Sequence, residues 1–287
     1  MRMLPNPNRG QQLHLLGAMM AESCARCLNH GVPSRVLGVG IGRSQCAEQL
    51  LDAVPPRVSL SCVEQSAADI KSISQVRRGA RLAKPVLVPS LQSLDNVHNR
   101  MALGLPKDPS SLENRFACAV MAEVLHDADE LAKRRALGFA RAAISPNGSL
   151  LIWDRFALDL DSPLTDERAS LWEHLHPTPV GTTPYGAYVA HLEALAEERE
   201  VARQAAARKG RSLAVGSWDS PQQCEALCRE LGFHAEVLFT SFDRFLLAAR
   251  PRPEADGETQ RRHDFEAWRD AKMDTLSERI RVSKKPP

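Results

Sequence analysis

The chain has 287 residues, 43% of them hydrophobic, so it can bury a sizeable core and suits one large α/β domain with appendages. Its 37 Lys and Arg against 35 Asp and Glu leave a formal net charge of +2, too balanced to indicate a nucleic-acid partner. There is no signal-peptide pattern and no run of about 18 apolar residues, so the sequence favours neither secretion nor membrane spanning. We therefore expect a cytoplasmic protein.

The seven cysteines agree with that expectation, because an odd number without an export signal favours reduced thiols. Cys24 and Cys27 have a spacing found in metal and redox sites. They lie within a helical pattern, however, and no second pair follows at the spacing of a zinc site. We therefore expect no metal.

The first predicted element is an amphipathic helix from Gln11 to Asn29, which Gly31 and Pro33 terminate. The next stretch, 35–44, is the most informative of the chain.

A run of apolar and β-branched residues there leads into three glycines, Gly38, Gly40 and Gly42, and a helical pattern follows over 45–51. This order predicts a buried strand, a tight turn and a helix N-terminus, as in α/β proteins that hold an adenosine-containing cofactor.

A second predicted strand covers Val58 to Val63 and ends in Glu64, whose carboxylate can accept hydrogen bonds from both hydroxyls of a ribose. Positions 40 and 64 are 24 residues apart, close to the offset of about 20 in dinucleotide-binding folds. The pattern G-x-G-x-x-G is not completed, because Gln45 stands where its last glycine would be. A site for the pyrophosphate of NAD is therefore disfavoured.

Strands and helices alternate from Arg35 to Trp153, the pattern of a doubly wound parallel sheet. We predict a third strand at Pro85–Pro89 and a loop from Ser90 to Glu113 that lines an adenine pocket. The fourth strand is predicted to end at His126, and the fifth ends near Trp153.

Four motifs in this order resemble those of class I S-adenosylmethionine (SAM)-dependent methyltransferases. They are the glycine loop with Gly40, Gly42 and Ser44 before Glu64, the strand Ala119–His126, the turn and strand Ala143–Trp153, and the ending Leu231–Phe233 with Phe245–Arg250. The resemblance implies a Rossmann-like methyltransferase sheet with helical N-terminal and lid additions, SAM as cofactor, and methyl transfer to a small-molecule acceptor. It implies a cofactor site at Gly38, Gly40, Gly42, Ser44, Glu64 and Gln65.

Two candidate catalytic residues, His126 and Asp127, end the predicted fourth strand, at the sheet edge where ligands of open α/β folds bind. If the acceptor carries an O–H or N–H, His126 can take its proton, since histidine titrates nearest neutrality. The alternative is that His126 only shapes the pocket.

Candidate substrate residues fall at the end of the fifth strand and in the insertion after it. Asp154 and Arg155 either contact a polar substrate or pair with each other. Tyr185 and Tyr188 either contact the substrate or anchor a long charged helix to the core. Arg199 either binds a carboxylate, as the resemblance implies, or belongs to a solvated helix face.

Within the family, the nearest likeness is to carboxy-S-adenosylmethionine synthases, which serve tRNA wobble-uridine modification. It rests on Leu13–Glu22, Trp153–Phe156 and Trp218–Ser220. It departs at Gly38, where that family has an acidic residue, at Arg9, where it has an aromatic residue, and in the long linker helix. The leading hypothesis is therefore a small-molecule methyltransferase. The alternatives are a carboxy-SAM synthase or related tRNA-modification enzyme, and a non-catalytic SAM-binding regulatory subunit.

The predicted organisation has five parts. They are an N-terminal helical cap (1–30), the SAM-binding core (31–160), a helical lid or dimer arm (161–212), the last helix and strands of the core (213–250), and a linker with a C-terminal helix (251–287). The apolar residues of the last part suit docking on the core or on a second copy, so a homodimer is a further expectation.

Overall fold

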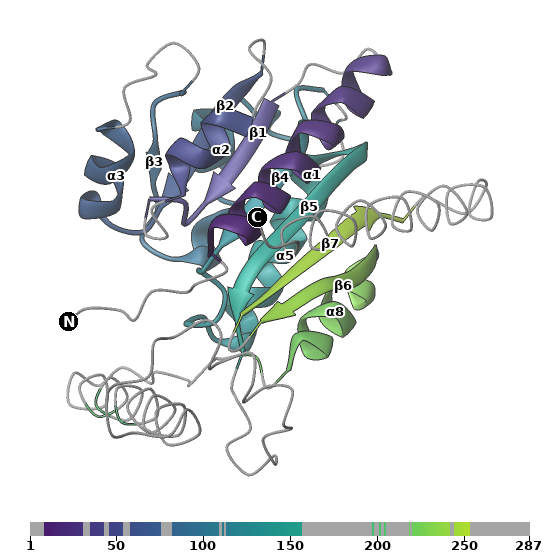
Figure 1. The fold of residues 1–287 in the computed structure, drawn as a ribbon. Coiled ribbons are helices and arrows are strands. Elements are labelled where there is room, and N and C mark those ends of the chain that lie inside the picture. The colour runs from purple at the N-terminus through teal and green to yellow at the C-terminus, as the bar shows by residue number, and fades with distance from the viewer. Residues whose placement is uncertain are drawn as a thin grey trace, which may run out of the picture.

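The computed structural model describes residues 9–30, 35–42, 46–53, 58–75, 82–108, 111, 113–156, 197, 201, 204, 218, 220–241 and 244–252. Within this part the chain forms a seven-stranded sheet in the order β3-β2-β1-β4-β5-β7-β6 (Figure 1). The strands are β1 Arg35–Val39, β2 Ser59–Glu64, β3 Val86–Leu87, β4 Phe116–Ala122, β5 Ile144–Arg155, β6 Phe233–Ser241 and β7 Arg244–Pro251.

Only β7 runs against its neighbours: it pairs antiparallel with β5 and β6, while the β1 to β5 pairings are parallel. The strand order reverses between β1 and β4, which places a topological switch point at their carboxyl ends. The predicted fold class is confirmed as far as the architecture goes: the sheet is doubly wound and Rossmann-like.

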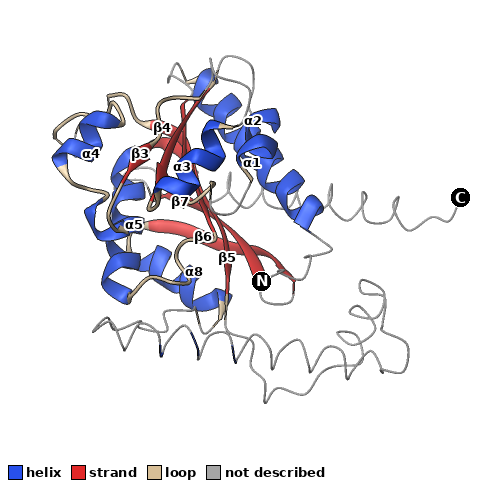
Figure 2. Cartoon of the chain, turned by 90° about the vertical axis from the view of Figure 1, so that its left-hand side faces the viewer, coloured by secondary structure: helices blue, strands red, loops and turns tan. Residues whose placement is uncertain are grey.

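Helices cover both faces of the sheet. They are α1 Arg9–Asn29, α2 Ala47–Ala53, α3 Ala67–Ser74, η1 Leu91–Ser93, α4 Val97–Ala102, α5 Glu130–Ala143 and α8 Pro221–Glu230. One buried core joins α1, α2 and α3 to one face, and a second core joins η1, α5 and α8 to the other. Figure 2 shows α1 and α2 on one side of the strands and α5 and α8 on the other.

The long first helix packs against α2, β4 and β5. Its Met19, Met20 and Cys24 are fully buried, and the indole nitrogen Nε1 of Trp153 donates to Gln12 Oε1 over 2.8 Å. Among the described residues, no helix is both long and apolar enough to cross a membrane.

The central strands form where the sequence reads as continuous apolar runs. Every residue of β4 is buried, which is expected of a parallel strand covered on both faces. The strand ends at Ala122, four residues earlier than predicted, because Glu123 adopts a positive φ of 50° and turns the chain away.

The predicted loop from Ser90 to Glu113 is wrong in part, because it contains η1 and α4. Asn96 caps α4 by accepting a hydrogen bond from the backbone N–H of His98. The helix buries Arg100, whose guanidinium bonds Asp95 Oδ1 and the carbonyl of Pro106. A charged residue in the core position hides the amphipathic pattern that would have identified this helix.

Candidate functional site

The glycine turn lies at the switch point, between the carboxyl ends of β1 and β4. Gly40 has a φ of 75°, and a Cβ on it would lie 2.7 Å from the carbonyl oxygen of Ala122 and 2.9 Å from Val124 Cβ. A Cβ on Gly42 would lie 2.4 Å from the carbonyl oxygen of Asp69 in α3. Both glycines therefore let the backbone of the turn lie closer to the neighbouring chain, after β4 and in α3, than a residue with a side chain could.

The acidic residue at the end of β2 is bonded to this turn. Glu64 is 1% exposed, and its Oε1 accepts a hydrogen bond of 2.8 Å from the backbone N–H of Gly42. Since a carboxylate oxygen has two lone pairs, this contact leaves acceptor capacity on the group for a ligand.

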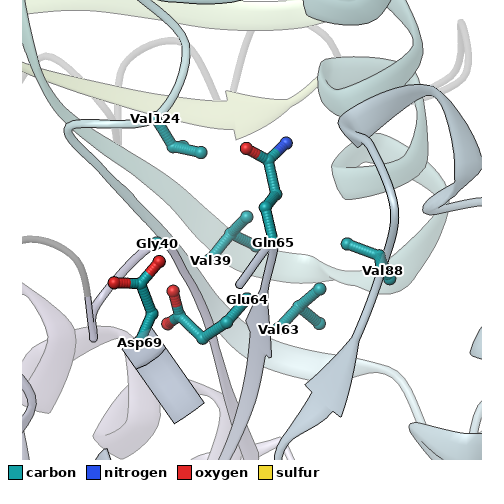
Figure 3. A pocket seen from close by; sticks show the side chains of 8 residues that line it. All are labelled: Val39, Gly40, Val63, Glu64, Gln65, Asp69, Val88 and Val124. Carbon is teal, nitrogen blue, oxygen red and sulfur yellow. The ribbon is translucent and has the colours of Figure 1, made fainter. Parts of the chain in front are cut away.

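A pocket opens between the ends of β1 and β2. It is lined by Val39, Gly40, Val63, Glu64, Gln65, Asp69, Val88 and Val124. Figure 3 shows the Glu64 and Asp69 carboxylates close together on one side, with Gln65 pointing toward Val124. The pocket thus combines carboxylates with valine side chains, which suits a ligand that has hydroxyl groups and an apolar ring.

Three predicted cofactor residues, Gly40, Glu64 and Gln65, line this pocket, and Gly42 holds the Glu64 carboxylate. Gly38 is not among the lining residues: it lies within β1, and a Cβ on it would lie 2.9 Å from Ile41 Cδ1.

Sequence reasoning missed Asp69, Val88 and Val124. Asp69 carried a signal, because Ser66 stands three residues before it. Ser66 caps α3 by accepting from the Asp69 N–H, and its hydroxyl donates to Asp69 Oδ2 over 2.6 Å.

Beyond Val124, the chain brings His126 into contact with the end of β5. The two atoms His126 Nδ1 and Asp154 Oδ1 are 2.6 Å apart. Because a carboxylate can only accept, this contact is a hydrogen bond when Nδ1 carries the proton, and Nε2 of the neutral ring then has the lone pair. His126 and Asp127 lie in the loop after β4, and the prediction that they end the strand is wrong.

The Asp154 carboxylate is 1% exposed and is surrounded by hydrogen-bond donors of the same chain. Its Oδ2 accepts from the backbone N–H of Leu125 and from Trp218 Nε1, and its Oδ1 also accepts from the backbone N–H of Arg155. The expected alternatives for Asp154 were a substrate contact or a pairing with Arg155. In the structure Arg155 contributes its backbone N–H, and the imidazole of His126 is a further partner of the carboxylate; a substrate contact stays a prediction.

The second candidate catalytic residue, Asp127, lies on the other side of the imidazole. Its Oδ1 is 3.3 Å from His126 Nε2, and its side chain is 48% exposed. Carboxylates therefore face both ring nitrogens.

Two arginine side chains lie near the carboxylate of Glu123, which directly follows β4. Its Oε1 lies 2.8 Å from Arg244 Nε and 3.6 Å from Arg155 Nε. Burial alone raises the pKa of Glu123, but Arg244 and Arg155 outweigh it, so the pKa lies below its ordinary value of 4.5. Arg155 therefore pairs with Glu123 through its side chain.

Several predicted site residues fall outside the described residues: Ser44, Tyr185, Tyr188 and Arg199. Most of the expected lid and the chain beyond 252 fall outside them as well. Within the described part, no group of three or more His, Cys, Asp or Glu side chains is arranged to hold a metal ion.

No protein-family model matches the chain, and no curated protein matches it. Solved structures with a similar fold include an O-methyltransferase family protein from Burkholderia thailandensis, with 15% identity, 85% of this chain and 56% of that chain covered, and a TM-score of 0.49. They also include the CurJ carbon methyltransferase, with 13% identity, coverage of 77% and 49%, and a TM-score of 0.46.

Human N-acetylserotonin methyltransferase, solved in complex with SAM, is similar at 14% identity, with coverage of 84% and 54% and a TM-score of 0.42. This chain thus spans about half the length of these proteins. A likeness at this level concerns the fold alone. The comparisons do not support the specific resemblance to carboxy-SAM synthases.

Proposed function

We propose that the protein is a SAM-dependent methyltransferase that acts on an O–H or N–H group of a small-molecule acceptor, with His126 as the general base. The observation that carries the proposal is the course of the loop after β4. Val124 lines the pocket at the glycine turn, and His126, two residues later, is bonded to a buried carboxylate. Cofactor pocket and base therefore adjoin at one edge of the sheet.

The residues of the pocket fit SAM. Glu64 offers carboxylate oxygens to the ribose hydroxyls, Val88 and Val124 offer apolar surface to the adenine, and Gly40 lets the backbone come close to the ligand. SAM, when bound, supplies a methyl group on a positively charged sulfur, which departs as a neutral thioether.

His126 would supply what the acceptor needs. As the acceptor oxygen or nitrogen forms its bond to the methyl carbon, its proton passes to Nε2 of His126. The Nδ1 proton stays on the ring and keeps its hydrogen bond to Asp154, so the ring becomes an imidazolium between Asp154 and Asp127. The proton then leaves to solvent, since Asp127 is half exposed.

Methyl transfer itself is an in-line displacement, so alignment and exclusion of water account for most of the remaining catalysis.

Predicted substrate contacts at Tyr185, Tyr188 and Arg199 stay part of the proposal, as do cytoplasmic location and a homodimer.

The full chain, incubated with methyl-deuterated SAM and a total extract of small metabolites, tests the proposal by mass spectrometry. We expect labelled product and S-adenosylhomocysteine in equal amounts. His126→Asn should lower the rate by about 10²- to 10⁴-fold, the usual contribution of a general base, while His98→Asn, an exposed change on α4, should leave it unchanged.

Two results would contradict the proposal. SAM binding without any labelled product would favour the non-catalytic alternative, and a carboxymethyl product would favour the carboxy-SAM route. A methylated product formed equally fast by His126→Asn would support the methyltransferase activity and rule out His126 as its general base.

A further inference from the structure

The Asp154 carboxylate accepts a hydrogen bond from the indole of a residue that is distant in the sequence. Trp218 is fully buried, and its Nε1 donates to Asp154 Oδ2 over 3.2 Å. A parallel bridge between Phe156 and Trp218 fixes the tryptophan just beyond the end of β5. Asp154 and Trp218 are 64 positions apart, so their contact is a product of the fold.

A buried cation lies on the face of the same indole. Lys133 of α5 is 4% exposed, and its Nζ is 4.1 Å from the centroid of the Trp218 ring. The indole therefore stands between an ammonium at its face and a carboxylate at its N–H edge. The cation draws electron density from the ring, which strengthens the N–H as a donor.

These contacts determine which way the carboxylate faces. Trp218 and the backbone N–H of Leu125 both donate to Oδ2, so Oδ1 is the oxygen that faces His126. A partial rotation of the carboxylate out of its present plane would break both bonds inside the core, where an unmade hydrogen bond to a charged group is costly. The oxygen opposite Nδ1 thus stays in place.

We propose that Trp218 is a positioning residue for His126: through Asp154, it keeps the neutral imidazole in the tautomer with the proton on Nδ1 and the lone pair on Nε2. The catalytic consequence rests on the proposed function of His126 as base. The tautomer itself does not, because it is a property of the protein without any ligand.

The chain offers a matched control for the loss of one indole N–H. Trp153 is equally buried and precedes Asp154 in β5, but its Nε1 donates to Gln12 in α1. Trp218→Phe and Trp153→Phe each keep an aromatic ring and lose one hydrogen bond. Only the first removes a donor from Asp154.

Nitrogen-15 NMR of the His126 ring, recorded without ligand at a pH where the ring is neutral, measures the tautomer. We expect the Nδ1–H form in the wild type and in Trp153→Phe, and a mixture of both forms in Trp218→Phe. Lys133→Met, which keeps the Trp218 N–H but removes the cation from its face, should give a smaller shift in the same direction. If Trp218→Phe does not fold, Lys133→Met provides the test.

In turnover, Trp218→Phe should lower kcat by up to about 100-fold, the scale of a misplaced catalytic group, with the KM for SAM unchanged. Trp153→Phe should keep the wild-type kcat. An Nδ1–H tautomer retained in Trp218→Phe, or lost equally in Trp153→Phe, would overturn the inference. A wild-type protein that does not bind SAM would contradict the proposed function and leave the tautomer result intact.

Discussion

Glu123 and Arg244 join the end of β4 to the beginning of β7 through two contacts, in which Glu123 Oε1 lies 2.8 Å from Arg244 Nε and 2.7 Å from Arg244 Nη2. Arg244 and Arg155 are directly opposite each other on the antiparallel strands β7 and β5. Like charges in such a pair repel, and the carboxylate of Glu123 between them offsets the repulsion.

Glu123→Gln should therefore destabilise the fold, because it leaves two partly buried guanidinium groups opposed. We expect the free energy of unfolding at neutral pH to fall by about 3 kcal/mol, the scale of breaking a buried ion pair. The folded-state pKa of Glu123 lies below 4.5, so this stabilisation is complete above about pH 4.5 and is lost as the pH falls through the folded-state value.

Urea unfolding at neutral pH and near pH 3 measures both effects: the difference in unfolding free energy between wild type and Glu123→Gln should be smaller near pH 3 than at neutral pH. Glu230→Gln, which breaks an exposed ion pair with Arg134, is the control and should cost less. An equal cost for the two substitutions would show that the Glu123 pair does not stabilise the sheet edge.

Two glycine substitutions should have opposite effects on stability. A Cβ on Gly42 would lie 2.4 Å from the backbone oxygen of Asp69, so Gly42→Ala must displace either the turn or α3. A Cβ on Gly138, inside α5, meets nothing within 4 Å. Gly138→Ala should raise the melting temperature through a gain of about 0.5–1 kcal/mol, and Gly42→Ala should lower it. A melting temperature unchanged by Gly42→Ala would contradict the packing described for the turn.

The seven cysteines should be unreactive in the folded protein, since all of them are buried. Burial and the neighbouring Cys27 raise the pKa of Cys24 to about 12, so very little of it is thiolate near pH 8. A disulfide reagent that releases a coloured thiolate should label all cysteines only after denaturant is added. Rapid labelling of Cys24 or Cys27 in native buffer would restore the redox interpretation of this pair.

The sheet could be predicted from the sequence because its central strands, β1 and β4, are continuous apolar runs between turn residues. The short helix α4 could not, since its buried residue is the charged Arg100 and leaves no apolar periodic pattern.

Residue types at the site were also visible in sequence, but their partners were not. Glu64 was identified by its place after a strand, whereas its bond to Gly42 depends on how β2 meets the turn. Asp154 was identified as a polar residue at a strand end. Its contacts with His126 and Trp218 join parts of the chain that only the fold brings together.

The most direct test of the central claim is a calorimetric titration of the full chain with SAM, repeated with Glu64→Ala, Glu64→Gln and the exposed change Glu48→Ala. We expect Glu64→Ala to weaken binding by about 1–3 kcal/mol, the cost of removing a charged hydrogen-bond partner. Glu64→Gln, which keeps an acceptor for Gly42, should lose less, and Glu48→Ala should bind as the wild type does. Unchanged SAM affinity in a folded Glu64→Ala variant, or no SAM binding by the wild type, would contradict the account.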